Sequence, residues 1–130
     1  MQRLDDAQIV YRTITKVRDI QQGRVLSYAF LRRSSPRDED GLSVDYNVEF
    51  PDGCGALLEP KSRRGIAELK VGSVREIPAV CNIPGTLDVL PDDPTHANIT
   101  GIPREEESVE LSESVAAELA VRAKLVWTQQ

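Results

Sequence analysis

Arginines stand at or near the ends of the apolar segments in the first third of the chain. Arg12 directly follows Tyr11 inside one such segment. Arg24 opens the next segment, and Arg32 and Arg33 close it. Guanidinium groups bind phosphates and carboxylates through paired, planar hydrogen bonds. If the two segments form neighbouring strands, two or three of these side chains are expected to converge on one anion, either a nucleotide phosphate or a carboxylate of a partner. The alternative is that they are surface charges whose aliphatic stems lie along the sheet.

Three polar residues further along the chain, Ser43, Asp45 and His96, have side chains that could act on a bound anion. His96 is the only histidine, and it is either a reactive group or a hydrogen-bonded structural residue at the start of a strand. Asp45 shares a strand face with Glu49, but the strand rise separates them by roughly 13 Å. Paired catalytic carboxylates in glycosidases lie about 5–10 Å apart. These two carboxylates are therefore expected to be solvent-facing polar groups.

The two cysteines differ in their expected exposure. Cys54 lies between Gly53 and Gly55, which predicts an accessible thiol, whereas Cys81 lies in an apolar context and is expected in or near the core. A nucleophilic thiol needs a neighbouring base or positive charge, and no local signature pairs Cys54 with His96. The chain has no close pair of zinc ligands, no glycine-rich phosphate loop and no nucleophile elbow. Neither a metal nor a cofactor is expected.

Length and composition indicate one domain spanning residues 1–130. Apolar residues make up 40% and charged residues 28%, which is typical of a globular chain rather than a disordered one. The net charge of −5 argues against broad nucleic-acid binding. No apolar run is long enough to span a bilayer, and the first nine residues do not form a signal peptide. A single potential cysteine pair then favours a reducing, cytoplasmic location.

Alternating apolar and polar residues predict the strands that must position these side chains. The clearest alternation covers Leu42 to Phe50, and a weaker one covers Ile66 to Ile77 with Gly72 as a bulge or tight turn. The β-branched and aromatic content predicts further strands. They are expected at residues 8–14, at 24–33 in preference to a short helix, and at 96–100, with a short one at 86–90 in an otherwise irregular 78–94.

The end of the chain changes to a helical pattern. Ser112 or Ser114 is expected to cap the helix start. An apolar stripe then follows at helical spacing, formed by Val115, Leu119, Ala123 and Val126, with Trp127 at the edge of its packing. Residues 34–41 are expected to form a loop, and 104–107 a solvated linker. The fold class is therefore α+β, with a mainly antiparallel twisted sheet of about five or six strands and a C-terminal helix packed on it.

Five short segments carry a resemblance to other proteins. They are Tyr11-Arg12, Gly23-Arg24-Val25, Ala29-Phe30 with Arg32, the Asp40-to-Val44 segment and His96-Ala97. Together they resemble a set of small uncharacterised bacterial proteins, over roughly residues 8–48 and 96–103. That set has no established activity, so the resemblance implies no catalytic roles. It implies that these positions form one site or one interface, and it favours a bacterial source.

Two functional interpretations follow, and the first is favoured. In the first, the protein is a small accessory protein that associates with a protein partner, as its acidic charge and lack of a catalytic motif suggest. In the second, it is a small enzyme or binder acting on a nucleotide or a similar anion. Arg12, Arg24 and Arg32 would then hold the anion, and Ser43, Asp45 or His96 would carry out any chemistry. Convergence of these side chains in one concave pocket distinguishes the two interpretations.

Overall fold

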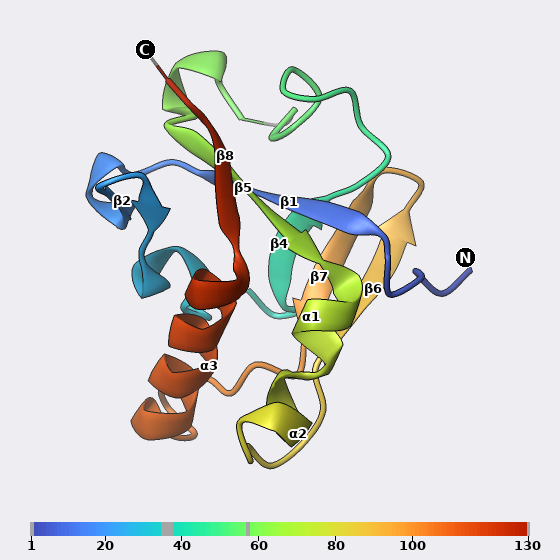
Figure 1. The fold of residues 1–130 in the computed structure, drawn as a ribbon, viewed down its shortest axis with the longest axis vertical. Helices are drawn as coiled ribbons and strands as arrows, with labels where there is room; N and C mark the ends of the chain where they lie inside the picture. The colour runs from blue at the N-terminus through green and yellow to red at the C-terminus, as the bar shows by residue number, and fades with distance from the viewer. Residues whose placement is uncertain (1, 35–37, 57, 130) are drawn as a thin grey trace.

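A six-stranded antiparallel sheet organises the molecule, which we describe from a computed structural model covering residues 2–34, 38–56 and 58–129 (Figure 1). The sheet has six strands in the order β6-β7-β4-β1-β5-β8, and β2 and β3 form a separate pair. The strands are β1 (Ile9–Ile14), β2 (Ile20–Gln21), β3 (Arg24–Val25), β4 (Leu42–Asp45), β5 (Gly65–Lys70), β6 (Asp88–Asp93), β7 (His96–Thr100) and β8 (Lys124–Thr128). The predicted α+β class, with its antiparallel sheet and C-terminal helix, is confirmed.

The helical elements are short except for the last one. They are the α-helices α1 (Val71–Arg75), α2 (Ile77–Val80) and α3 (Val109–Arg122), and the 3-10 turns η1 (Val17–Asp19), η2 (Ser27–Phe30) and η3 (Pro60–Ser62). Helix α3 buries Val115 and Leu119, as its spacing predicts, and adds Ala116. These side chains join one core cluster with strand residues such as Val10 and with Phe30 of η2. The sheet is therefore covered on one face by α3, η2 and α1.

The predicted ends of α3 were wrong in detail. Ser108, not Ser112 or Ser114, caps the helix, and its Oγ accepts a hydrogen bond from the amide of Leu111 at 3.2 Å. The helix stops before Ala123, because the β-branched and aromatic run that follows pairs with β5 as strand β8. Val126 and Trp127 thus belong to a strand, in which Trp127 pairs with Ile66.

Three predicted strands are shorter than expected. The strand expected to run to Phe50 ends at Asp45, since Asn47 adopts a left-handed φ of 52°. The segment expected as strand 66–77 becomes helical at Val71, where Gly72 lies so close to Asp6 that an added Cβ would meet it at 2.9 Å. The segment expected as strand 24–33 contains only two strand residues before η2 begins.

Strand β7 spans His96–Thr100, as the sequence predicts. The next residue, Gly101, has a φ of +90°, and a Cβ there would lie 2.0 Å from the carbonyl oxygen of Thr86. The expected short strand at 86–90 is present as β6, displaced to Asp88–Asp93, but the segment expected to be irregular also contains α2. The loop expected at 34–41 includes residues 35–37, which lie outside the described residues.

On the other face of the sheet, the described residues between Asn47 and Arg64 pack against β1 and the end of β4, where Gly55 lies against Thr13 and its amide donates to Asp45. The ring of Tyr11 packs against Phe50 with centroids 5.3 Å apart. Arg63 donates hydrogen bonds to the backbone oxygens of residues 51, 52 and 54, and so holds this segment together. The thiol predicted to be accessible at Cys54 is instead fully buried, with 0% of the residue exposed, because the glycine turn folds inward onto Thr13.

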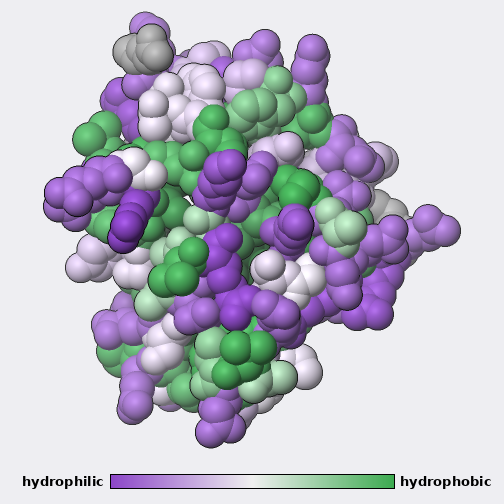
Figure 2. All heavy atoms as spheres, in the orientation of Figure 1, coloured by the Kyte–Doolittle hydropathy of each residue, from purple (hydrophilic) through white to green (hydrophobic). Residues whose placement is uncertain are grey.

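On the face of the molecule that Figure 2 shows, apolar side chains do not form one continuous area. The space-filling view shows them interspersed with polar residues over the visible face (Figure 2). No helix among the described residues is long and apolar enough to cross a bilayer.

Candidate functional site

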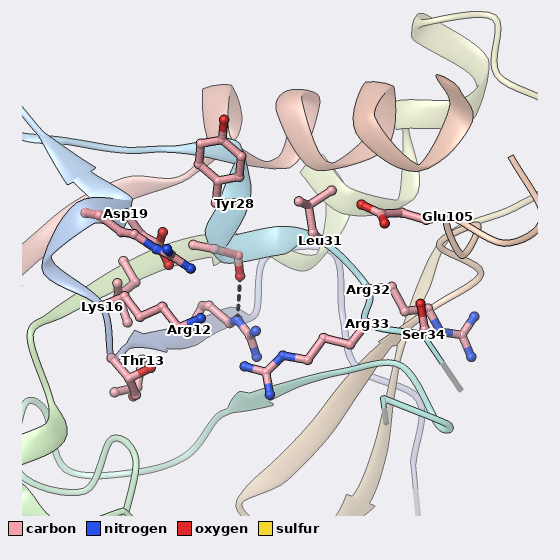
Figure 3. A pocket seen from close by; sticks show the side chains of 14 residues that line it. Arg12, Thr13, Lys16, Asp19, Tyr28, Leu31, Arg32, Arg33, Ser34 and Glu105 are labelled. Atoms are coloured by element: carbon pink, nitrogen blue, oxygen red, sulfur yellow. Dashed lines mark hydrogen bonds between the residues drawn. The ribbon is translucent and has the colours of Figure 1, made fainter. Parts of the chain in front are cut away.

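A basic pocket lies beside the end of β1, between η1, η2 and the segment that follows η2 (Figure 3). Its volume is about 310 Å³, within the usual range for small-ligand sites. Five cationic side chains and two anionic ones line it, in a protein whose net charge is −5. The cations are Arg12, Lys16, Arg18, Arg32 and Arg33, and the anions are Asp19 and Glu105. We call this site the basic pocket.

Arg12 forms the inner wall of the basic pocket. It lies on the helix-covered face of β1, the same face as the buried residues Val10 and Ile14. Its Nε donates to the carbonyl oxygen of Ala29 at 3.0 Å, and its Nη1 donates to that of Ser43 at 2.9 Å. Its Nη2 donates to none of the described residues. Arg12 therefore links η2 to β4 and retains one nitrogen for a ligand.

Burial lowers the pKa of the Arg12 guanidinium below its ordinary value, and the positive charge of Arg33 lowers it further. The negative charges of Asp38, Asp19 and Asp45 act in the opposite direction without cancelling these effects. A lowered pKa means that the protein around Arg12 disfavours its charged form. A bound anion would relieve that penalty.

Three other cations of the basic pocket have side chains without partners. The side chains of Lys16, Arg18 and Arg33 make no hydrogen bond or ion pair with the described residues. Figure 3 shows Arg33 extending toward Arg12, whereas Arg32 points to the opposite side. The charge that could meet a ligand thus comes from Arg12, Arg33, Lys16 and Arg18.

The guanidinium groups of Arg32 and Arg104 donate to backbone carbonyl oxygens and do not point into the basic pocket. Arg32 donates to the carbonyl oxygens of Asp38, Glu39 and Ile102 at 2.8 to 3.0 Å. Arg104 donates to the carbonyl oxygen of Arg33 at 2.8 Å. The prediction that residues 104–107 form a solvated linker was wrong for Arg104, which is only 8% exposed. Together the two arginines fix the chain on both sides of Arg33, and so position its side chain.

The remaining predicted site residues lie elsewhere. Arg24 is exposed on β3 and does not line the basic pocket. Ser43 and Asp45 alternate with the buried Leu42 and Val44, so their side chains lie on the face of the sheet opposite Arg12. His96 pairs with Asp45 across the β4–β7 ladder and shares that opposite face. Arg12 and Arg32 thus both line the basic pocket but point to opposite sides, and the side chains of Arg24, Ser43, Asp45 and His96 lie outside it.

The polar side chains on that opposite face bond to one another. The Nδ1 of His96 lies 2.6 Å from Oδ1 of Asp92, and Asn98 donates to Oδ2 of the same carboxylate at 3.1 Å. Asp45 accepts a hydrogen bond from the amide of Gly55 at 2.9 Å. Burial alone would raise the pKa of Asp92, but the hydrogen bonds from His96 and Asn98 outweigh it and hold that pKa below its ordinary value.

Cys54 lies in the segment between Asn47 and Arg64 that packs against this face, and it is fully buried. Burial raises the pKa of its thiol to about 11, and the negative charge of Asp45 adds to this effect against the opposing charge of Arg63. A thiol with such a pKa is protonated near neutrality and is a poor nucleophile. Cys54 is therefore a structural residue.

A second, larger pocket of about 550 Å³ lies between the N-terminal segment, α2 and the start of β6. Its central cation, Arg75, forms ion pairs at 2.8 Å with both Asp6 and Asp88. Burial alone would lower the pKa of Arg75, but these two carboxylates outweigh it and raise the pKa. The charge of Arg75 is therefore neutralised, whereas Arg3, the other cation of this pocket, forms no ion pair with the described residues.

Sequence reasoning missed several residues of the basic pocket, namely Lys16, Arg18, Asp19 and Tyr28. They belong to the connection after β1 and to a segment interpreted as strand. The cluster of two cations and a carboxylate in Lys16-Val17-Arg18-Asp19 was the available signal. The sequence does not show that one side of this segment is buried, because the connection has no periodic pattern of apolar residues.

Among the described residues, no three histidine, cysteine or carboxylate side chains are gathered as a metal site would require. Comparisons of the chain with protein-family models, curated proteins and solved structures found no match. The resemblance to small bacterial proteins stays a prediction.

Proposed function

We propose that this protein binds a small anionic ligand in the basic pocket. The observation that carries the proposal is the concentration of unpaired positive charge in one concave site of an acidic protein. Arg12 is held in place by two backbone carbonyl oxygens and directs its remaining nitrogen to the ligand. Arg33, Lys16 and Arg18 supply further charge without needing to break an existing ion pair.

The excess of cations favours a ligand with more than one negative charge. A phosphoryl group carries about two charges near neutrality, and arginine binds it through paired hydrogen bonds. A single carboxylate would leave most of the lining charge uncompensated. The proposed ligand is therefore phosphorylated, which agrees with the second of the two interpretations drawn from the sequence.

This proposal does not include a catalytic reaction. Ser43, Asp45 and His96, the residues considered for chemistry, lie on the far side of the sheet from the Arg12 guanidinium. Association with a protein partner and a cytoplasmic location stay predictions from charge and cysteine content.

The test is isothermal titration calorimetry of the full chain with pyrophosphate, comparing the Arg33→Ala and Arg24→Ala variants. Both changes remove one arginine charge, but only Arg33 lines the basic pocket. Because the Arg33 side chain makes no hydrogen bond to the described residues, its loss should not unfold the protein. We expect Arg33→Ala to weaken pyrophosphate binding by about tenfold or more, and Arg24→Ala to leave it within about twofold.

Absence of pyrophosphate binding to the unmodified protein would overturn the proposal. Equal weakening by the two variants would also overturn it, since that result would show only a general response to net charge. Urea denaturation of both variants provides the folding control.

A further inference from the structure

Asp19 is an unusual component of a pocket that is otherwise basic. It ends η1, lines the pocket and is only 7% exposed. Its backbone oxygen accepts a hydrogen bond from the amide of Leu26 at 2.7 Å, which fixes the residue between η1 and η2. Its carboxylate accepts no hydrogen bond from the described residues, and its Oδ1 is buried.

A carboxylate this deeply buried normally has donors around it, because burying the charged group without them is costly. The charge of Asp19 acts on Arg12, but no ion pair joins the two side chains. Arg12 directs two of its nitrogens to carbonyl oxygens instead. Asp19 and Arg12 thus face the same space without contacting each other, one as an unused acceptor and the other with an unused donor.

A ligand that bonds to both Arg12 and Asp19 must carry an anionic group and a hydrogen-bond donor a few ångströms apart. Inorganic phosphate provides the anion but is much smaller than a pocket of about 310 Å³. A phosphorylated sugar provides a dianion, neighbouring hydroxyl donors and a size that suits the pocket. Carboxylates are known to accept hydrogen bonds from sugar hydroxyls in nucleotide sites.

We propose, on the basis of the anion-binding function above, that the basic pocket takes a phosphorylated sugar. The phosphate binds Arg12 and Arg33, and a sugar hydroxyl donates to the carboxylate of Asp19. The sugar is either free or part of a nucleotide. Tyr28, which lines the pocket and is 66% exposed, offers its ring to a base in the second case.

The experiment compares ribose 5-phosphate with ethyl phosphate by calorimetry on the full chain. Both ligands carry a phosphate monoester, but ethyl phosphate lacks hydroxyl groups. We expect ribose 5-phosphate to bind about tenfold tighter, as a hydrogen bond to a charged acceptor allows. Equal affinities would overturn the role of Asp19 and leave anion binding standing. Failure of both ligands and of pyrophosphate to bind would overturn the proposed function itself.

The Asp19→Ala variant gives a second, independent readout. Removing the acceptor should abolish the preference for ribose 5-phosphate. Removing a negative charge from a basic pocket should leave ethyl phosphate binding unchanged or tighter. A purely structural role for Asp19 would weaken both ligands together, and that result would contradict the inference. The comparison of two ligands on the unmodified protein remains decisive if this variant does not fold.

Titration with adenosine monophosphate distinguishes a site for free sugar phosphates from a site for nucleotides. A nucleotide site predicts that it binds tighter than ribose 5-phosphate and that Tyr28→Ala removes the difference. A site for free sugar phosphates predicts that the base adds nothing and that Tyr28→Ala has no effect. Either pattern supports the shared chemistry of a phosphate next to a hydroxyl.

Discussion

The two faces of the sheet carry polar groups of opposite character. On the face of the sheet opposite Arg12, which we call the open face, the carboxylate of Asp92 receives hydrogen bonds from His96 and Asn98, and that of Asp45 receives one from a backbone amide. On the covered face, Arg12 extends into a pocket where the side chains of Arg33 and Asp19 have no partners among the described residues. The residues most often associated with chemistry, a histidine and two aspartates, lie in the cluster that is already satisfied.

The pKa shifts show the same difference. The hydrogen bonds around Asp92 lower the pKa of this acid, which means that its charged form is stabilised without any ligand. The surroundings of Arg12 lower the pKa of this base, which means that its charged form is disfavoured. A polar cluster of the first kind contributes to folding, and one of the second kind is suited to binding. The presence of reactive residue types alone does not separate the two.

Removal of Arg12 is expected to have the largest effect on stability. Arg12→Met keeps the aliphatic length but leaves the carbonyl oxygens of Ala29 and Ser43 without their donors. We expect a loss of about 3 kcal/mol in the free energy of unfolding, measured by urea denaturation. His96→Ala, which removes a more exposed contact, is expected to cost less than about 1 kcal/mol. A cost for Arg12→Met no larger than that for His96→Ala would contradict the linking role of Arg12.

The next expected effect concerns the thiol of Cys54, which is buried within the Asn47–Arg64 segment. Cys54 is fully buried, whereas Cys81 is partly exposed. We expect a thiol-specific reagent at neutral pH to label Cys81 first and Cys54 about 100-fold more slowly, through opening of the structure. Mass spectrometry of peptides from the labelled protein measures both rates. Rapid labelling of Cys54 in the native protein would show that the Asn47–Arg64 segment does not cover it.

The high pKa of Cys54 also has a consequence for stability in alkali. A folded-state pKa raised to about 11 contributes stability that is complete below the unfolded-state pKa and is lost as pH rises through the folded value. Cys54→Ala should therefore flatten the decline in stability between about pH 9 and pH 11. If the stability of Cys54→Ala declined as steeply as that of the unmodified protein in this pH range, the raised pKa of Cys54 would be contradicted.

The smallest expected effect is the acid dependence of the Asp92 cluster. Because the folded-state pKa of Asp92 is lowered, its contribution to stability is present above the unfolded-state pKa and is lost as pH falls through the folded value. Asp92→Asn should make the fall in stability below about pH 4 less steep. Arg12 does not titrate in this range, so its variant should keep the slope of the unmodified protein. Thermal denaturation between pH 2 and pH 6 compares the three proteins.

Strand β7 shows what the sequence predicted well. Its alternation is short and ends at Gly101, a position where a side chain would collide with the backbone of residue 86. The strand predicted to run from Leu42 to Phe50 shows the limit, because Asn47 takes a left-handed conformation that alternation does not reveal. In the same way, Val71 continues the alternation of β5 although it is the first residue of α1, in which the three-residue spacing places the buried Val71 and Val74 on one face.

The candidate site was predictable only in part. Placing Arg12 and Arg32 near one another follows from their positions at the ends of apolar segments. The use of Arg32 on three backbone carbonyl oxygens depends on long-range contacts that reach as far as Ile102. The burial of Asp19 depends on how η1 packs against η2, and no periodic pattern in the sequence carries that information. Strand register, which separates Arg12 from Asp45, likewise depends on pairing between distant segments.

In the proposed function, the basic pocket binds the ligand and the open face does not. Nitrogen-15 correlation spectra of the labelled protein, recorded during titration with pyrophosphate, test it most directly. We predict that the largest shifts occur in the amides of residues 12–19 and 28–34, with no progressive shifts around His96 and Asn98. Shifts concentrated on β6 and β7, or no shifts at all, would contradict the claim.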